Sequence, residues 1–191
     1  MTNTTIWAID PLHSDVQFKI KHLVISTVTG TFRKFDGRII KVGDDFNNAK
    51  VNFKIDVKSI DTNQAQRDEH LKSGDFFAAD EFPEITFEST SFVNQSGSDY
   101  KMIGNLIMKG VTKSVELNVE YGGSEDNGHG ILKHGFEVTG TVNRIEFGMT
   151  WNKLTDTGGL GLGENIKLIA NIQVAELVEE AVEIKASLQD S

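Results

Sequence analysis

The sequence contains no cysteine, so disulfide bonds cannot stabilise it and the redox state of its compartment is left open. It also lacks an apolar run long enough to cross a bilayer. Basic residues are in the minority, with 19 Lys and Arg against 28 Asp and Glu, and the net charge of −9 argues against a nucleic-acid partner. The first residues, 1–7, lack the basic and apolar regions of a secretory signal. We therefore expect a protein that does not span a membrane and is cytoplasmic as given, or periplasmic if a leader was removed.

Motifs of the common enzyme classes are missing too. There is no Gly-x-Ser-x-Gly elbow, and the glycine-rich run at 158–163 matches neither the dinucleotide fingerprint nor the P-loop. The histidines are scattered along the chain, at His13, His22, His70, His129 and His134. Only the last two are close in sequence, and their spacing lacks the one-face geometry of a helical zinc motif, so we interpret them as ordinary surface histidines. The sequence therefore predicts a protein that is not an enzyme, with no metal site and no cofactor.

What the sequence does contain is alternation of apolar and polar residues at the two-residue period of β-strands. The clearest case is 49–57, where a shift of one residue would turn lysines toward the core. Similar segments occur at 7–9, 15–21, 28–35, 37–42, 84–89, 100–108, 115–121, 136–140 and 166–174. Between two of them, the pair Asp36 and Gly37 is typical of a tight hairpin turn. About eight antiparallel strands at hairpin spacing predict one all-β domain, a barrel or a sandwich.

One segment between these strands, 62–74, has a helical pattern instead. Asp61 or Thr62 is expected to cap its start, and Gly74 fits the left-handed position just past its end. The segment can push three large apolar side chains toward a core, namely Leu71, Phe76 and Phe77. We therefore predict a short helical insertion that acts as a lid or plug.

Charged residues around this insertion, Arg67, His70 and Asp75, have two interpretations. They can hydrogen-bond a polar head group at the mouth of a cavity, or they can fix the helix and its exit by capping and local ion pairs. A charged group buried at a lid must be paired to be tolerated. The second interpretation is favoured, because charged residues around a short helix are usually structural or solvated.

The period of the apolar residues changes once more after Glu176. Apolar residues then recur at helical spacing amid glutamates, at Leu177, Ala181, Ile184 and Leu188. We therefore divide the chain into a barrel domain at 1–177 and an acidic tail at 178–191. The tail is either an amphipathic helix or a loosely packed segment.

Four blocks of residues, in order along the chain, resemble the signatures of the YceI-like family. These blocks are 10–22 with 30–37, 67–77 with 83–89, 104–115, and 143–149. The departures are Ala78 and Ala79, where an acidic residue often follows the paired Phe, and the acidic tail. The resemblance implies an eight-stranded antiparallel, lipocalin-like β-barrel around a polyisoprenoid, an isoprenoid quinone or an amphiphilic fatty-acid derivative. It implies no catalysis, and it implies a homodimer because members of the family are often dimeric.

The residues expected to bind this ligand combine the inward faces of the strands with the helical insertion. Alternation assigns the faces, but it does not separate a cavity wall from a packed core. The candidates are Phe18, Ile20, His22, Val51, Phe53, Ile55, Arg67, His70, Leu71, Phe76, Phe77, Phe87, Met102, Leu106, Leu117, Val119, Phe136 and Met149.

Two functions follow from these patterns and stay open. The leading one is storage, transport or scavenging of a long-chain lipid, including in a stress response. The alternative is a filled barrel that acts as a non-enzymatic structural or stress-response module and contacts a protein partner through the terminal amphipathic stretch. An eight-stranded barrel can enclose side chains or one apolar ligand, and periodicity cannot distinguish the two cases.

Overall fold

The computed structural model describes residues 3–23, 25–153, 156 and 161–178. Its strands are β1 (Thr4–Ile9), β2 (Asp15–His22), β3 (Ser26–Phe32), β4 (Phe35–Val42), β5 (Lys50–Asp56), β6 (Ile60–Asp61), β7 (Glu84–Ser96), β8 (Asp99–Met108), β9 (Val111–Asp126), β10 (Leu132–Asn143) and β11 (Leu162–Glu176). This part of the chain also contains the helix α1 (Ala65–Lys72) and the 3-10 turns η1 (Pro11–His13), η2 (Val57–Ser59) and η3 (Arg144–Phe147). From residue 179 onward, the predicted acidic tail lies outside the described residues.

Three of the long strands are bent and interrupted. β1 and β2 form one strand broken by η1, β3 and β4 form the next, and β5 and β6 form a third broken by η2. Corresponding halves pair with each other, so that β1, β4 and β5 are neighbours in one half, while β2, β3 and β6 are neighbours in the other.

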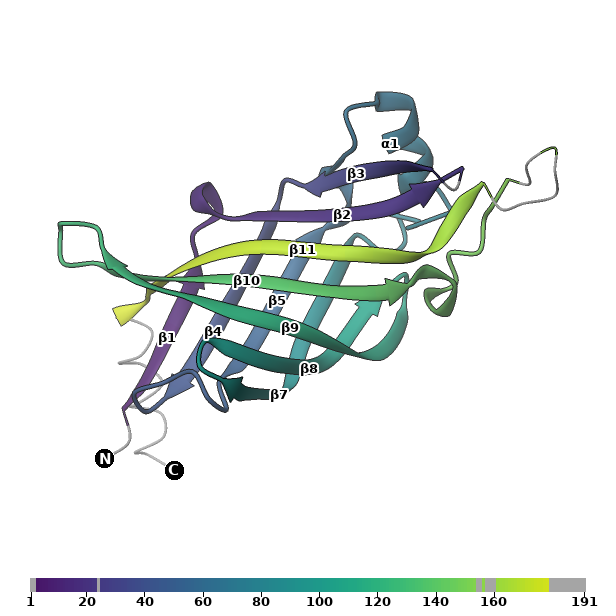
Figure 1. Ribbon diagram of the computed structural model, residues 1–191. Coiled ribbons are helices and arrows are strands. Elements are labelled where there is room, and N and C mark those ends of the chain that lie inside the picture. Colours follow the sequence, from purple (N-terminus) through teal and green to yellow (C-terminus); the bar gives the residue numbers. More distant parts are fainter. Residues whose placement is uncertain (1–2, 24, 154–155, 157–160, 179–191) are drawn as a thin grey trace.

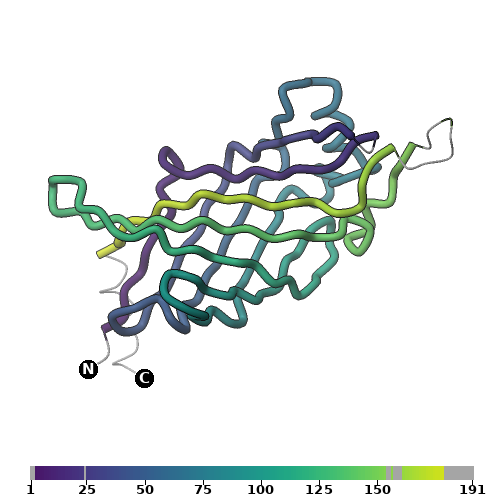
Figure 2. The backbone as a smooth tube through the Cα atoms, viewed as in Figure 1, coloured from purple at the N-terminus to yellow at the C-terminus, as the bar shows by residue number. Residues whose placement is uncertain are grey.

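The remaining strands complete a ring. From β5 the sheet continues through β7, β8, β9 and β10 to β11, and every neighbouring pair is antiparallel. β11 then pairs with β2 over 162–171 and with β1 over 174–176, which joins the two edges of the sheet (Figure 1; Figure 2). With the bent strands counted as continuous, the predicted eight-stranded antiparallel barrel with a short helical insertion is confirmed.

The break between β1 and β2 is held by the carboxylate of Asp10. Its Oδ1 accepts a hydrogen bond from the backbone N–H of Leu12 (3.1 Å), and its Oδ2 lies 2.8 Å from His13 Nδ1. Lys133 Nζ, on β10, donates to the same Oδ2 at 2.8 Å. The bond from Lys133 is the main reason why the pKa of Asp10 is lowered to about 2. The turn between β1 and β2 is therefore held by side-chain hydrogen bonds.

The predicted hairpin at Asp36 and Gly37 is wrong. Both residues lie inside β4, and the chain bends at 33–34 instead, without reversing. Gly37 does not have the positive φ of a hairpin turn, and a Cβ at this position would come within 2.8 Å of the Asn52 carbonyl oxygen. Glycine is therefore needed because the neighbouring strand approaches closely, not because the chain turns.

The predicted helix forms, but its predicted N-caps are wrong. Gln64 occupies the cap position and makes no side-chain capping bond. Thr62 instead donates from its backbone N–H (2.9 Å) and from its hydroxyl to the carboxylate of Asp68, within the helix. The carboxylate of Asp61 pairs with Arg33 at 2.7 Å. The start of α1 is therefore anchored by a carboxylate that reaches back from its first turn.

The exit of the helix also differs from the prediction. Gly74 is not in the left-handed region, whereas Ala78 is, with a φ of 47°. The chain leaves α1 through the extended residue Ser73, whose hydroxyl donates to the His70 carbonyl at 2.6 Å. The backbone N–H of Ala78 then closes the turn onto the Ser73 carbonyl at 2.9 Å. Backbone bonds further along the chain, rather than a glycine, end this helix.

An aromatic cluster fills the end of the barrel opposite α1, where β1 starts and β11 ends (Figure 1). Its rings belong to Trp7, Phe46, Tyr121, His134 and Phe136, and we call it the aromatic plug. The His134 ring is edge-on to two of them, 4.4 Å from Trp7 and 4.9 Å from Phe46 between centroids. Such edge-to-face contacts add to the stabilisation from area burial.

His134 is therefore not the surface histidine that the sequence predicts. It is 7% exposed, because it shares the inward face of β10 with Phe136, whereas His129 is exposed in the loop before β10. Its Nδ1 lies 2.7 Å from the Tyr121 hydroxyl, and its Nε2 has no hydrogen-bond partner among the described residues. Burial, and secondarily the nearby Lys41 ammonium, lowers the pKa of His134 from its ordinary value.

This pKa shift predicts a pH dependence of stability. An unfolded histidine titrates near 6.5, so the unfolded chain binds more protons than the folded one between that pH and the lower folded pKa. The contribution of His134 to stability should be complete above about pH 7 and should fall as the pH decreases below 6.5 toward the lower folded pKa. In urea unfolding, His134→Gln should lose less stability than wild type over that interval. Equal losses in the two proteins would show that His134 is not responsible. Asp10 loses its contribution only below about pH 4, outside this window.

Candidate ligand-binding cavity

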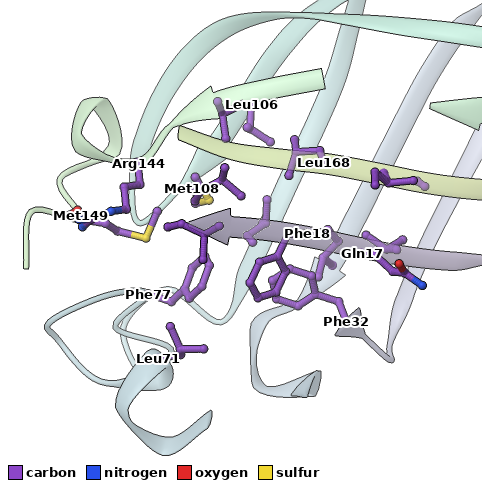
Figure 3. A pocket seen from close by; sticks show the side chains of 18 of the residues that line it. Gln17, Phe18, Phe32, Leu71, Phe77, Leu106, Met108, Arg144, Met149 and Leu168 are labelled. Carbon is purple, nitrogen blue, oxygen red and sulfur yellow. Dashed lines mark hydrogen bonds between the residues drawn. The ribbon is translucent and has the colours of Figure 1, made fainter. Parts of the chain in front are cut away.

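The barrel encloses a cavity of about 970 Å³. This volume lies at the upper end of the range of small-molecule pockets, about 300–1,000 Å³. Inward-facing side chains of the strands form its walls, and α1 with the segment that follows it covers one end (Figure 3). Exposed residues of the lining, Leu23, Gln66 and Lys153, lie at this end, so the cavity opens to solvent beside α1. We call this opening the mouth.

The structure places every predicted ligand-binding residue in the lining of this cavity. The strands supply Phe18, Ile20, His22, Val51, Phe53, Ile55, Phe87, Met102, Leu106, Leu117, Val119 and Phe136, and the helical insertion and the segment after η3 supply Arg67, His70, Leu71, Phe76, Phe77 and Met149. They come together because alternate residues of every strand face the barrel axis.

Other lining residues were missed by the sequence analysis. Apolar ones include Ile9, Val16, Phe32, Ile39, Ile85, Phe92, Met108, Val138, Val142, Trp151, Leu162, Ile166, Leu168, Ala170 and Ile172. Most of them lie at inward-facing positions of strands, as most of the predicted residues do. The apolar alternation of β11 also predicts a strand, but none of its residues was among the predicted ligand-binding residues. The signal was therefore present for the strand residues. Trp151 and Arg144 lie outside the alternating segments, and nothing in the local pattern marks them.

Aromatic contacts hold α1 and the segment after it, which together form the lid, onto the barrel wall. The Phe77 ring is edge-on to Phe32 at 6.0 Å, and Phe32 is 5.5 Å from Phe18 between centroids (Figure 3). Phe76 lies 5.4 Å from Trp151. Below them, the backbone N–H of Phe77 donates to the Leu71 carbonyl at 3.0 Å. The three apolar side chains predicted to form a lid, Leu71, Phe76 and Phe77, therefore cover the cavity from the side of α1.

Arg144 is the buried charge of the cavity, with 1% of its surface exposed. Its guanidinium donates to backbone carbonyls on both sides of the mouth: those of Gly163 (2.8 Å), Trp151 (2.8 Å), Met149 and, at 3.4 Å, Leu162. The planar fork thereby ties the exit of η3 to the start of β11. These hydrogen bonds lie where the pairing of β11 with β2 is irregular, between Leu162 and Ile166.

No carboxylate of the described residues forms an ion pair with Arg144. Burial lowers the pKa of its guanidinium, and Glu164, exposed on β11, partly offsets that effect. Among the described residues, the hydrogen-bond acceptors of this charge are backbone carbonyls in a low-dielectric setting.

The predicted polar residues of the insertion make local contacts. Arg67 donates from Nε to the Thr62 hydroxyl (2.8 Å) and from Nη2 to the Thr62 carbonyl (2.7 Å). His70 Nε2 lies 2.8 Å from the carboxylate of Asp75. Their predicted role in fixing the helix and its exit is confirmed. A head-group role for Arg67 and His70 stays a prediction.

In the part of the chain that the structure describes, His, Asp and Glu side chains nowhere gather in a group of three that could hold a metal ion. None of its helices has the length and apolar character needed to cross a membrane.

The fold and the site define an antiparallel β-barrel with an enclosed apolar cavity. Residues 7–188 match the family model of the YceI-like domain, and the chain belongs to this family, as the resemblance indicated. It is 41% identical over 174 residues to a UPF0312 protein of Staphylococcus aureus strain USA300, which covers 91% of this chain and 97% of that protein.

Solved structures show the same barrel. The YCEI protein of Campylobacter jejuni is 30% identical, with a TM-score of 0.69 over 83% of this chain and 91% of that one. A polyisoprenoid binding domain from Saccharophagus degradans has a TM-score of 0.63 over 88% of this chain and 97% of that one. At 13% identity, the second likeness shows the fold alone.

Removing the Arg144 fork should destabilise the protein. We expect Arg144→Met to lower the free energy of unfolding by about 3 kcal/mol, because several carbonyls lose their donor where water is excluded. Arg33→Met, which removes an exposed guanidinium paired with Asp61, should change it by less than about 1 kcal/mol. Urea unfolding of both variants measures the difference. Equal effects would contradict the role assigned to Arg144.

Proposed function

We propose that this protein binds a long-chain apolar ligand inside the barrel and stores, transports or scavenges it. The ligand classes considered are polyisoprenoids, isoprenoid quinones and amphiphilic fatty-acid derivatives. One observation carries the proposal: the barrel interior contains a large apolar cavity that its own side chains do not fill. The proposal requires no catalysis and no cofactor.

The energetics of burial support a chain-like ligand. Each methylene removed from water contributes about 0.8 kcal/mol, so a chain of about twenty carbons contributes about 16 kcal/mol gross. That exceeds the cost of association, about 4–15 kcal/mol. Along the walls the lining is mostly apolar, so this part of the site selects on length and shape.

The alternative of a filled barrel loses support because of the same cavity. Its proposed contact surface, the terminal amphipathic stretch, lies almost entirely outside the described residues. The Saccharophagus degradans domain is described as polyisoprenoid binding, which agrees with the proposal. The observation that supports this function for the chain is its own cavity.

A carboxylate placed in the lid tests this function. Phe76→Asp should weaken binding of cis-parinaric acid, a fluorescent long-chain polyene, by more than about tenfold, because an unpaired charge would face the ligand chain. Leu71→Asp should act in the same way. The matched control is Ile131→Asp, which makes the same change at an exposed position outside the cavity.

Circular dichroism and urea unfolding establish that the variants are folded. Wild-type affinity in a folded Phe76→Asp protein would remove the lid from the site. Failure of the wild-type protein to bind any long-chain probe would contradict the function itself.

A further inference from the structure

The charged residues of the cavity have the opposite sign to the protein as a whole. The chain carries a net charge of −9. At the α1 end, however, the cavity is lined by the cationic residues Arg67, Arg144 and Lys153, with Asp156 as the carboxylate of the described lining. Arg38 also borders the cavity, but it is exposed on the outer side of β4. This end of the cavity therefore has an excess of positive charge, although the net charge of the protein is negative.

Arg144 supplies a charge that forms no ion pair with an acidic side chain of the described residues. Its partners are carbonyl oxygens, and the contact from Nη2 to Leu162 is long, at 3.4 Å. A guanidinium has five N–H donors, and the hydrogen bonds to these carbonyls leave part of Nη2 unused. Because the charge lies in an apolar setting, its interaction with an anion in the cavity is weakly screened.

Arg67 is a second guanidinium of the cavity lining that has N–H donors without an acceptor among the described residues. Thr62 holds its Nε and Nη2, and no residue in the described part of the chain accepts a hydrogen bond from its Nη1. The nearest carboxylate along the helix, Asp68, is bonded twice to Thr62 and forms no ion pair with Arg67. The guanidinium is therefore oriented by the protein but keeps two N–H donors free on a residue that lines the cavity.

Both arginines lie at the same end of the cavity. Arg67 and His70 are one turn apart on the same side of α1. The His70 ring is edge-on to Trp151, 4.7 Å between centroids, and the Trp151 carbonyl accepts a hydrogen bond from Arg144. A short chain of contacts thus connects the two guanidinium groups, and Lys153 lies two residues beyond Trp151. Of the carboxylates nearby, Asp75 is paired with His70 and Glu164 is exposed on β11.

We propose that the ligand carries an anionic head group, a carboxylate or a phosphate, bound at the α1 end between Arg67 and Arg144. This inference rests on the proposed function and narrows its ligand class. Planar guanidinium forks match the oxygens of both groups, and hydrogen bonds between charged partners are stronger than neutral ones. The site would therefore favour fatty acids or prenyl phosphates over neutral isoprenoid quinones, with the chain extending toward the aromatic plug.

Two probes that differ only in the head group test the proposal on the full chain. cis-Parinaric acid should bind wild-type protein at least about tenfold more tightly than its methyl ester at neutral pH. Arg67→Gln should reduce this preference to less than about threefold, because it should weaken binding of the acid much more than binding of the ester. Arg67→Lys, which keeps the charge, should retain part of the preference. Lys101→Gln removes a cation paired with Glu116, away from the mouth, and should behave as wild type.

The outcomes separate this inference from the proposed function. Equal, tight binding of acid and ester would overturn the anionic head group and leave the carrier function standing. Binding of neither probe would overturn both. A preference for the acid that stays at the wild-type level in folded Arg67→Gln would show that Arg67 does not hold the head group and would overturn the assigned site.

Displacement of the bound ester distinguishes the two kinds of anion. Palmitic acid and hexadecyl phosphate are each compared with hexadecanol, which has the same chain and a neutral head. If both anions displace the ester more strongly than hexadecanol, the stronger of the two identifies the head group. Stronger displacement by palmitic acid identifies a carboxylate site, and stronger displacement by hexadecyl phosphate identifies a phosphate site. Equal displacement by hexadecanol would overturn the proposal.

Discussion

The barrel depends on β11 pairing with two partners in succession along one edge. It follows β2 for most of its length and then β1, and these pairings join the two edges of the sheet. This is possible because the first long strand bends at η1, where Asp10 is bonded to Lys133 on β10. With β6 as the short strand at the end of the sheet, the longer strands are paired on both sides, and one face of every strand turns toward a common interior.

The two ends of that interior differ: one is closed by aromatic side chains, and the other is bordered by charged residues. At one end the aromatic plug packs around His134, so side chains fill the barrel completely. At the other end, α1 and the segment after it form a lid. Phe77 and Phe76 of this lid contact the rings of Phe32 and Trp151, and charged residues lie beside it. In the orientation we propose, the chain of the ligand points toward the plug and its head group toward the arginines.

The sequence could predict whatever depends on alternation. Phe53, Phe87 and Leu117 were placed in the lining correctly, because inward and outward residues alternate strictly along a barrel strand. His134 follows the same alternation beside Phe136, yet a histidine in a loop-flanking position was interpreted as exposed. Its burial depends on rings from three other parts of the chain, which no local pattern contains.

Features that depend on distant partners could not be predicted. The pair Asp36 and Gly37 has the composition of a turn, but the neighbouring strand at Asn52 requires the glycine. Asp61 has the composition of a helix cap, but Arg33 takes its carboxylate. Arg144 was seen only as part of a family signature. Its role comes from carbonyls that the fold brings together from two segments on either side of the mouth.

The central claim is that the cavity holds a long apolar chain, and mass spectrometry of an organic extract of the native, purified protein tests it most directly. An unrelated protein prepared identically from the same cells is the reference. The account predicts a long-chain amphiphile or isoprenoid in stoichiometric amount in the extract of this protein and not in that of the reference. An empty extract, together with no uptake of added lipid by the folded protein, would contradict it.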